Sequence, residues 1–359
     1  MTNLSDLPLR DSLKGRQPYG APQLHVAVAL NVNENTHAIP AEVKADIVAR
    51  ISNALEQINR YPDREFMALR SKLANYLGAG LSPEQIWAAN GSNEVIQQIF
   101  QAFGGPGRKA MGFEPTYSMY SIIAQGTDTE YARAGRLDRY ELTAEFASAQ
   151  VKLHKPNIVL LCSPNNPTGT PLSLDVIEAV YAATDGIVVV DEAYAEFSAD
   201  GAKSAISLLP GRPRLLVSRT MSKAFAFAGA RVGYLAADAA VIDALRLVRL
   251  PYHLSAFTQA AAEAALDHAS VMLAAVDEIR QQRDRLVTEL ESMGLDPFRS
   301  DANFVLFGGL EDPAEVWQKL LDRGVLVRNV GIDGTLRVTA GTASETSAFL
   351  DALREVIHN

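Results

Sequence analysis

Residues 157–169 read Asn-Ile-Val-Leu-Leu-Cys-Ser-Pro-Asn-Asn-Pro-Thr-Gly, and this stretch decides the fold class. Its first half is short, aliphatic and rich in β-branched residues, and its second half is polar. Two later stretches share this pattern, at 186–194 (Gly-Ile-Val-Val-Val-Asp-Glu-Ala-Tyr) and 214–225 (Arg-Leu-Leu-Val-Ser-Arg-Thr-Met-Ser-Lys-Ala-Phe). Short apolar runs of this kind predict buried parallel strands. We therefore expect an α/β fold with a mostly parallel central sheet flanked by helices.

The segments around these strands predict two domains. Residues 40–59 and 63–77 have helical periodicity, and Pro62 separates them. From about residue 238 the chain turns helical until 293. Strand-like pieces follow, at 303–307, 325–328 and 335–339. We expect a large domain over 36–250 and a smaller α+β domain that combines residues 1–35 with 251–359.

Composition limits the classes of partner and the cellular compartment. The formal net charge is −9 and there is no long basic run, which argues against nucleic acid or an anionic membrane as the main partner. The one cysteine, Cys162, excludes an intrachain disulfide framework and fits a reducing cytoplasm. The N-terminus lacks the apolar stretch of a signal peptide, and no window approaches a membrane span. The six histidines are scattered, so we expect no metal site.

Polar residues follow each predicted strand. In open α/β sheets ligands bind at the carboxyl ends of the strands, which here lead into Asn166, into Asp191 and Tyr194, and into Lys223 followed by Arg231. These groups match the needs of a phosphorylated pyridine aldehyde. A lysine amine can form a Schiff base, an aspartate can hold the pyridine nitrogen protonated, and an arginine with hydroxyls and helix-start N–H groups can bind a phosphate.

With these residues in place, the chain resembles the fold-type I aminotransferases that use pyridoxal 5'-phosphate, and among them the histidinol-phosphate aminotransferases. The resemblance covers nearly the whole chain. Its further landmarks are Leu30-Asn-Val-Asn-Glu-Asn35, Arg60-Tyr-Pro-Asp63, Gly91-Ser-Asn-Glu94, Glu114-Pro-Thr-Tyr-Ser-Met-Tyr120, Pro251-Tyr-His-Leu-Ser255 and Leu336-Arg-Val-Thr339. Two positions depart from the family pattern: Asn93 stands where many relatives carry aspartate, and Thr36 where proline is usual.

The resemblance implies roles for the cofactor residues. Lys223 would form the Schiff base, Asp191 would hold the pyridine nitrogen, and Asn166 and Tyr194 would bind the phenolic oxygen. Tyr117 would stack on the ring. The residues implied for the phosphate are Ser92, Asn93, Thr220, Ser222 and Arg231, with Tyr61 from the neighbouring subunit of a homodimer.

The resemblance also implies a substrate site and a reaction. Arg337 would bind a carboxylate, and the other candidates for substrate contacts are Arg328, Tyr19, Tyr252 and Asn35. The implied reaction moves an amino group between L-histidinol phosphate and 2-oxoglutarate by a ping-pong mechanism, in histidine biosynthesis. Which tyrosines meet the substrate phosphate stays open.

Three other functions stay open at this point. An aromatic amino-acid aminotransferase would accept phenylalanine or tyrosine in a similar pocket. A pyridoxal-phosphate lyase such as a threonine-phosphate decarboxylase would share the scaffold without converting the cofactor to its amine form. A regulator that binds the cofactor without turnover would carry a DNA-binding domain in front, and only about 35 residues precede the first predicted helix.

Single residues of the set, taken alone, could have a purely structural role. Asp191 could cap a helix, Asn166 could form a turn, and Tyr61 and Tyr117 could be packing residues. Their order along the chain favours the cofactor site. By contrast, Gly105-Pro-Gly-Arg-Lys-Ala110 formally resembles a dinucleotide fingerprint but follows a helical pattern instead of a strand, so we expect only a turn there.

Overall fold

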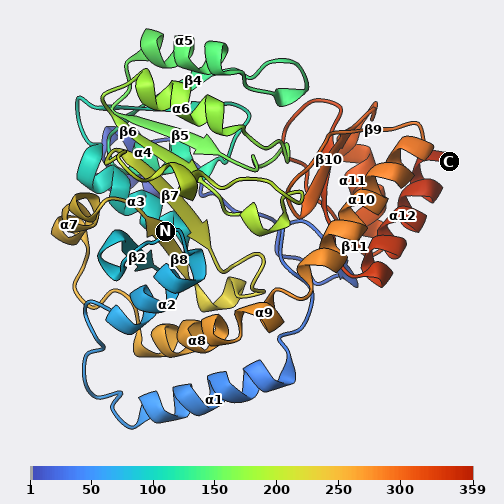
Figure 1. Ribbon diagram of the computed structural model, residues 1–359. Helices are drawn as coiled ribbons and strands as arrows, with labels where there is room; N and C mark the ends of the chain where they lie inside the picture. Colours follow the sequence, from blue (N-terminus) through green and yellow to red (C-terminus); the bar gives the residue numbers. More distant parts are fainter. Residues whose placement is uncertain (1–2, 359) are drawn as a thin grey trace.

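A computed structural model describes residues 3–358 and shows a seven-stranded sheet with helices around it (Figure 1). The strand order is β2-β8-β7-β6-β5-β3-β4. The strands are β2 (Ile86–Ala89), β3 (Lys109–Phe113), β4 (Glu130–Ala134), β5 (Ile158–Cys162), β6 (Ile187–Asp191), β7 (Leu215–Thr220) and β8 (Gly233–Ala236). The pairs from β4 to β7 are parallel, and β8 is antiparallel to both β7 and β2. The expected mostly parallel α/β sheet is confirmed.

The three strands expected from the sequence are β5, β6 and β7, neighbours at the centre of the sheet. Nearly all of their residues are buried, as the apolar runs predicted. Their register aligns Cys162 with Asp191 and Asp191 with Ser218. Because the strands are parallel and end together, the polar residues that follow them meet at one edge of the sheet.

Nine α-helices follow the chain through this part of the molecule. They are α1 (Ala41–Leu55), α2 (Met67–Leu77), α3 (Ser92–Phe103), α4 (Met119–Gly126), α5 (Ala144–His154), α6 (Leu174–Ala182), α7 (Ala239–Val248), α8 (Ala256–Asp267) and α9 (Ala269–Met272). The helix expected over 63–77 begins only at residue 67, because the Asp63 carboxylate accepts the backbone N–H groups of Glu65 and Met67 and so forms a cap in front of it. Of the stretch 105–110 in which we expect a turn, residues 105–108 form one, with Gly105 and Gly107 at positive φ, whereas Lys109 and Ala110 already belong to β3.

A smaller unit, which we call the small domain, lies beside the large sheet (Figure 1, orange to red). Its strands are β9 (Asp296–Pro297), β10 (Phe304–Gly308) and β12 (Leu336–Thr339) in one antiparallel sheet, and β1 (Val28–Ala29) paired in parallel with β11 (Val325–Leu326). Its helices are α10 (Val276–Ser292), α11 (Pro313–Asp322) and α12 (Ala343–His358). All three strand-like pieces expected near the C-terminus are strands here.

The helical stretch expected over 238–293 is divided into α7, α8, α9 and α10. Asp238 and Ser255 accept backbone N–H groups at the starts of α7 and α8, and Pro251 lies in the break between these helices. Short 3-10 helices occur between the main elements, at Leu4–Asp6, Asp11–Leu13, Pro83–Gln85, Asp138–Tyr140, Ala195–Phe197, Ala205–Leu208 and Ala228–Ala230. Within residues 3–358 no helix has the length and apolar composition needed to cross a bilayer.

Contacts near the two expected domain limits refine the division of the chain. β1 joins the small domain, as expected for the N-terminal segment, but Arg10 and Ser12 hydrogen-bond to Asp128 beside α4. Helix α8 packs on α1 and α2, whereas α10 packs on β9, β10 and α12. The division stays a prediction, and these contacts favour a boundary near residue 275 instead of 250.

Candidate active site

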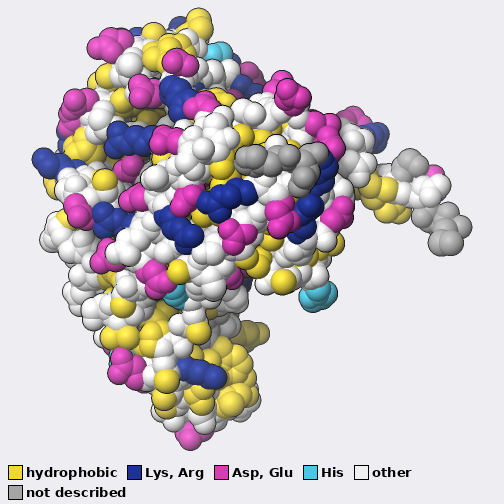
Figure 2. Space-filling view, turned by 90° about the vertical axis from the view of Figure 1, so that its right-hand side faces the viewer, with side chains coloured by type: hydrophobic (Ala, Val, Ile, Leu, Met, Phe, Trp, Pro, Cys, Tyr) yellow, Lys and Arg dark blue, Asp and Glu magenta, His cyan; other side chains and the backbone are white. Residues whose placement is uncertain are grey.

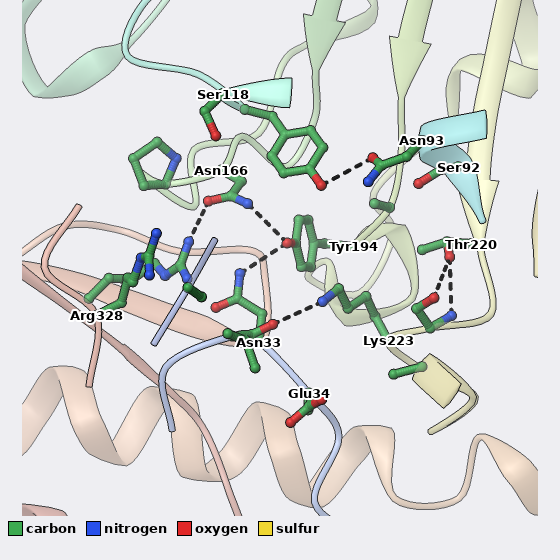
Figure 3. A pocket seen from close by; sticks show the side chains of 18 of the residues that line it. Asn33, Glu34, Ser92, Asn93, Ser118, Asn166, Tyr194, Thr220, Lys223 and Arg328 are labelled. Atoms are coloured by element: carbon green, nitrogen blue, oxygen red, sulfur yellow. Dashed lines mark hydrogen bonds between the residues drawn. The ribbon is translucent and has the colours of Figure 1, made fainter. Parts of the chain in front are cut away.

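A cavity of about 590 Å³ lies at the carboxyl ends of β5, β6 and β7 (Figure 3). The N-terminal segment, α3 and the small domain complete its walls. Most residues expected in the site line this cavity: Tyr19, Ser92, Asn93, Tyr117, Asn166, Asp191, Tyr194, Thr220, Ser222, Lys223, Arg231, Arg328 and Arg337. Residues that lie far apart in the sequence therefore meet in one place.

Lys223 lies in the turn directly after β7, with its amine in the cavity (Figure 3). Its Nζ donates a hydrogen bond to the backbone oxygen of Val32 at 3.1 Å. Burial lowers the pKa of the Lys223 amine to about 8, with Arg337 lowering it further and Glu34 opposing the shift. A substantial fraction of the amine is therefore neutral and nucleophilic near physiological pH.

Asp191, the last residue of β6, is only 2 % exposed. The hydroxyl of Tyr120 donates to its Oδ2 at 2.8 Å, while Oδ1 has no hydrogen-bond partner among the described residues. Burial raises the pKa of this carboxyl to about 6, and the Tyr120 hydrogen bond opposes the rise. A buried carboxylate with one unpaired oxygen in a cavity fits a protonated ring nitrogen, which would supply both the missing donor and a positive charge.

Tyr194 is at the centre of a chain of hydrogen bonds (Figure 3). Its hydroxyl oxygen accepts from the amide nitrogens of Asn33 at 3.0 Å and Asn166 at 3.2 Å. Arg337 Nη1 donates to Asn166 Oδ1 at 2.5 Å, and Arg337 Nη2 donates to the backbone oxygen of Asn31 at 3.0 Å. The phenol and the arginine are thus fixed relative to each other through one amide.

The start of α3 and Arg231 form one end of the cavity. Gly91 precedes the helix with φ of 88°, and a Cβ added to it would lie 2.3 Å from Arg231 Nη2. A Cβ on Gly233 would lie 2.0 Å from the backbone nitrogen of Ser92. Both glycines are therefore required for the guanidinium and the helix start to approach each other. Free N–H groups at a helix start beside an arginine are suited to bind a phosphate.

Hydroxyl groups complete this phosphate cradle. Thr220 donates to Ser222 Oγ at 3.0 Å, and the backbone N–H of Ser222 donates to Thr220 Oγ1 at 3.1 Å. At the same end the Tyr117 hydroxyl donates to Asn93 Oδ1 at 3.1 Å. Burial raises the pKa of Tyr117 to about 12, so it stays a neutral donor. Figure 3 shows Ser92, Asn93 and Thr220 together at this end.

Two arginines lie at the other end of the cavity, where Figure 3 shows Arg328. Arg337 on β12 is largely buried, and its Nε has no partner within the described chain. Burial lowers the pKa of Arg337 to about 10, and the neighbouring charge of Arg328 adds to the shift. Tyr19 also lines the cavity. Two neighbouring guanidinium groups, one with an unused donor, favour a ligand with an anionic end.

Three of the expected site residues do not line the cavity of their own chain. Tyr61 is 80 % exposed and stacks on Tyr252, with 4.4 Å between the ring centroids. The side-chain amide of Asn35 hydrogen-bonds to the main chain: its Nδ2 donates to Ala224 O at 3.1 Å, and its Oδ1 accepts from the His37 N–H at 3.0 Å. Asn35 therefore holds the N-terminal segment against the turn that carries the active lysine.

Several residues in and around the cavity were not assigned from the sequence. Tyr120 contacts Asp191, Asn33 contacts Tyr194, and Glu34 lies near Lys223. All three lie inside the motifs that carry the family resemblance, but no local pattern shows which side chain meets which. Among the residues that the structure describes, no group of His, Cys, Asp and Glu has the makings of a metal site.

Comparison with known proteins gives consistent matches over the whole chain. The family model for aminotransferase class I and II matches residues 26–353. The histidinol-phosphate aminotransferase of Paenarthrobacter aurescens (strain TC1) is 64% identical over 360 residues, covering 99% of this chain and 97% of that protein. The one from Thermobifida fusca (strain YX) is 56% identical over 351 residues, covering 98% and 96%. The crystal structure of histidinol-phosphate aminotransferase from Sinorhizobium meliloti in complex with pyridoxal-5'-phosphate has a TM-score of 0.84 at 25% identity, covering 93% and 91%.

Proposed function

The chain belongs to the class I and II aminotransferase family, and on that basis we propose that it is a histidinol-phosphate aminotransferase of histidine biosynthesis. The reaction moves the amino group of L-histidinol phosphate to 2-oxoglutarate, giving imidazole acetol phosphate and L-glutamate. Pyridoxal 5'-phosphate is the cofactor. The observation that carries the proposal is one cavity in which Lys223 lies between a phosphate cradle and Arg328 (Figure 3).

The residues present fit this cofactor. The cradle of Ser92, Thr220, Ser222 and Arg231 would hold its phosphate, and Asp191 Oδ1 would accept the hydrogen of its ring nitrogen. Asn166 and Tyr194 would bind the phenolic oxygen, and Tyr117 would lie against the ring. When bound, the cofactor supplies an electron sink that weakens the C–H bond at the carbon carrying the substrate's amino group.

Lys223 would carry out the proton transfers. Its Nζ would hold the cofactor, and it would be free to move protons once a substrate amine occupies the site. Nζ can then act as a general base and accept a proton from the substrate carbon that carries the amino group. It can afterwards donate that proton as a general acid. The lowered pKa of about 8 suits both roles, because base and acid forms are then both populated near neutral pH.

Arg337, Arg328 and Tyr19 would bind the anionic ends of two different substrates. L-Histidinol phosphate has a phosphate and no carboxylate, whereas glutamate has two carboxylates. An arginine fork can accept either group in a bidentate manner. The unpaired Nε of Arg337 provides one such donor inside the cavity.

We also propose that the enzyme is a homodimer that works in the cytoplasm. Exposed apolar side chains gather at the lower end of the molecule in Figure 2, at the level where Figure 1 shows α1. Exposed large apolar residues lie on or just after α1 (Val48, Leu55 and Ile58) and on α7 or in the segment that follows it (Leu247, Leu250 and Tyr252). Exposed apolar side chains of this kind support an interface between copies. The unpaired, buried Cys162 and the biosynthetic reaction support the location.

Mixing two inactive variants tests the proposed role of Tyr61. Tyr61→Ala and Lys223→Ala are each expected to have little activity. After unfolding and refolding together in equal amounts, hybrid dimers would contain one intact site, and activity should reach about a quarter of the wild-type value. Gel filtration gives the size of each species. Activity of the mixture no higher than that of the separate variants would contradict a tyrosine supplied across the interface.

A half-reaction with the loaded enzyme tests the substrate. The yellow form is mixed in turn with L-histidinol phosphate, L-histidinol and phenylalanine, and loss of the visible absorption is followed. We expect the absorption to fall at least about a hundredfold faster with L-histidinol phosphate than with L-histidinol. L-Histidinol has no phosphate and would leave two arginines without an anion. Equal rates with phenylalanine would instead support an aromatic amino-acid aminotransferase.

A further inference from the structure

The buried hydroxyl of Tyr120 has no role in the site described above. Tyr120 lies in the first turn of α4 and is fully buried, and its hydroxyl donates to Asp191 Oδ2 at 2.8 Å. Its ring meets that of Tyr117 edge-on, with 5.5 Å between the centroids. The residues directly before α4 and its first turn therefore carry both the side chain expected on the cofactor ring and the side chain that holds the carboxylate for its nitrogen.

The other side chains around Asp191 do not orient it. Cys162 lies beside it on β5 and donates to the backbone oxygen of Pro164 at 3.5 Å. The carboxylate of Glu192, the next residue in the chain, accepts hydrogen bonds from Ser204 and Arg219. Within residues 3–358, Tyr120 is the one side chain that donates a hydrogen bond to Asp191. The carboxylate plane therefore depends on this contact and on the backbone N–H of Ala193.

We infer that Tyr120 is a positioning residue for the cofactor: its hydroxyl holds Asp191 Oδ2 and so leaves Oδ1 for the ring nitrogen. This inference rests on the cofactor site of the proposed function. Tyr120 acts through Asp191 and does not itself line the cavity.

The balance of forces on the carboxylate supports this role. Burial and the charge of Glu192 raise the pKa of Asp191, whereas the hydrogen bonds from Tyr120 and the Ala193 N–H lower it. Burial and the nearby carboxylate hold the pKa of Tyr120 well above its ordinary value, so its hydroxyl remains a donor. The Cys162 thiol interacts with the same Tyr120 hydroxyl and is itself held neutral by burial, so it adds no charge beside Asp191. Removing it should leave Asp191 protonated up to a higher pH.

Cofactor-analogue binding to the apo protein tests the inference without turnover. The probe is 4'-deoxypyridoxine 5'-phosphate, which lacks the aldehyde and cannot bond to Lys223. Its dissociation constant is measured for wild type and Tyr120→Phe at pH values on both sides of the Asp191 pKa. We expect the variant to bind about tenfold more weakly at neutral pH, and the pH midpoint of binding to rise by about one pH unit.

Two further variants distinguish a positioning role of Tyr120 from general damage to the fold. Tyr131→Phe removes another buried hydroxyl, on a residue that neither hydrogen-bonds to Asp191 nor lines the cavity, and should bind the probe like wild type. In an Asp191→Asn background, Tyr120→Phe should cause no further loss, because the carboxylate through which it acts is gone. An equal loss in both backgrounds, or an unchanged midpoint in Tyr120→Phe, would overturn the inference. Wild-type apo protein that fails to bind pyridoxal 5'-phosphate would instead overturn the proposed function.

Discussion

Lys223→Ala is expected to lower the rate of amino transfer by about 10⁴-fold or more, because it removes both the nucleophile and the general base and acid. The variant should fold, since Lys223 makes one hydrogen bond, to a backbone oxygen, and its burial is unfavourable for a charged amine. The measurement is a steady-state assay with L-histidinol phosphate and 2-oxoglutarate. A half-reaction in a spectrophotometer shows whether the bound cofactor still reacts.

The matched control for this variant is Lys152→Ala, which truncates an exposed lysine on α5 that does not line the cavity. It should retain wild-type rates and thermal stability. Added methylamine offers a second check, because a small free amine can replace part of the missing base. A Lys223→Ala enzyme with rates near those of wild type would remove the basis of the assigned site.

Asp191→Asn is expected to lower the rate by about 10³-fold, because an amide cannot hold a positive charge on the ring nitrogen. The variant keeps an acceptor for the Tyr120 hydroxyl, so the change is mainly one of charge. Asp200→Asn, which changes an exposed carboxylate paired with Arg280, is the control and should leave the rate unchanged. A rate loss of only a few-fold would show that Asp191 does not face the ring nitrogen.

Asp191→Asn should also make the apo protein more stable than the wild type at neutral pH. Burial raises the pKa of Asp191 from 3.8 to about 6, so the folded protein holds this proton more tightly than the unfolded chain does. The free energy of unfolding of the wild-type protein therefore falls by about 3 kcal/mol as the pH rises from about 4 to about 6, because Asp191 loses its proton. Asp191→Asn has no such proton and should not show this fall. Urea unfolding of both apo proteins below and above this window measures the difference. Parallel curves would contradict the raised pKa.

Much of the fold and of the cofactor site can be predicted from the sequence, because both follow from local patterns. The apolar runs before Asn166, Asp191 and Lys223 predict buried parallel strands, and parallel strands bring the residues after them to one edge. The helix limits are less accurate: a side-chain cap at Asp63 delays α2 by several residues without changing the hydrophobic period. The start of each element therefore depends on hydrogen bonds that the pattern does not contain.

The contacts between side chains could not be predicted in the same way. Tyr120 and Asp191 are separated by 71 residues, and Asn33 and Tyr194 by 161 residues, so no spacing rule connects them. Asn35 belongs to the same motif as Asn33, yet it faces the main chain at Ala224 and not the cavity. A difference of two residues in an irregular segment changes the direction of a side chain, and only the folded packing determines it.

Residues 31–33 form one wall of the cavity through contacts with Arg337, Lys223 and Tyr194. This wall is held by the pairing of β1 with β11, whose residues lie about 300 positions later in the chain. A ribosome therefore makes the wall first and the strand that fixes it almost last. Because domains generally fold in the order of their synthesis, the large domain can form while its active site still lacks this side. The binding site is completed only on nearly finished chains, and an interrupted polypeptide would leave the lysine open to water.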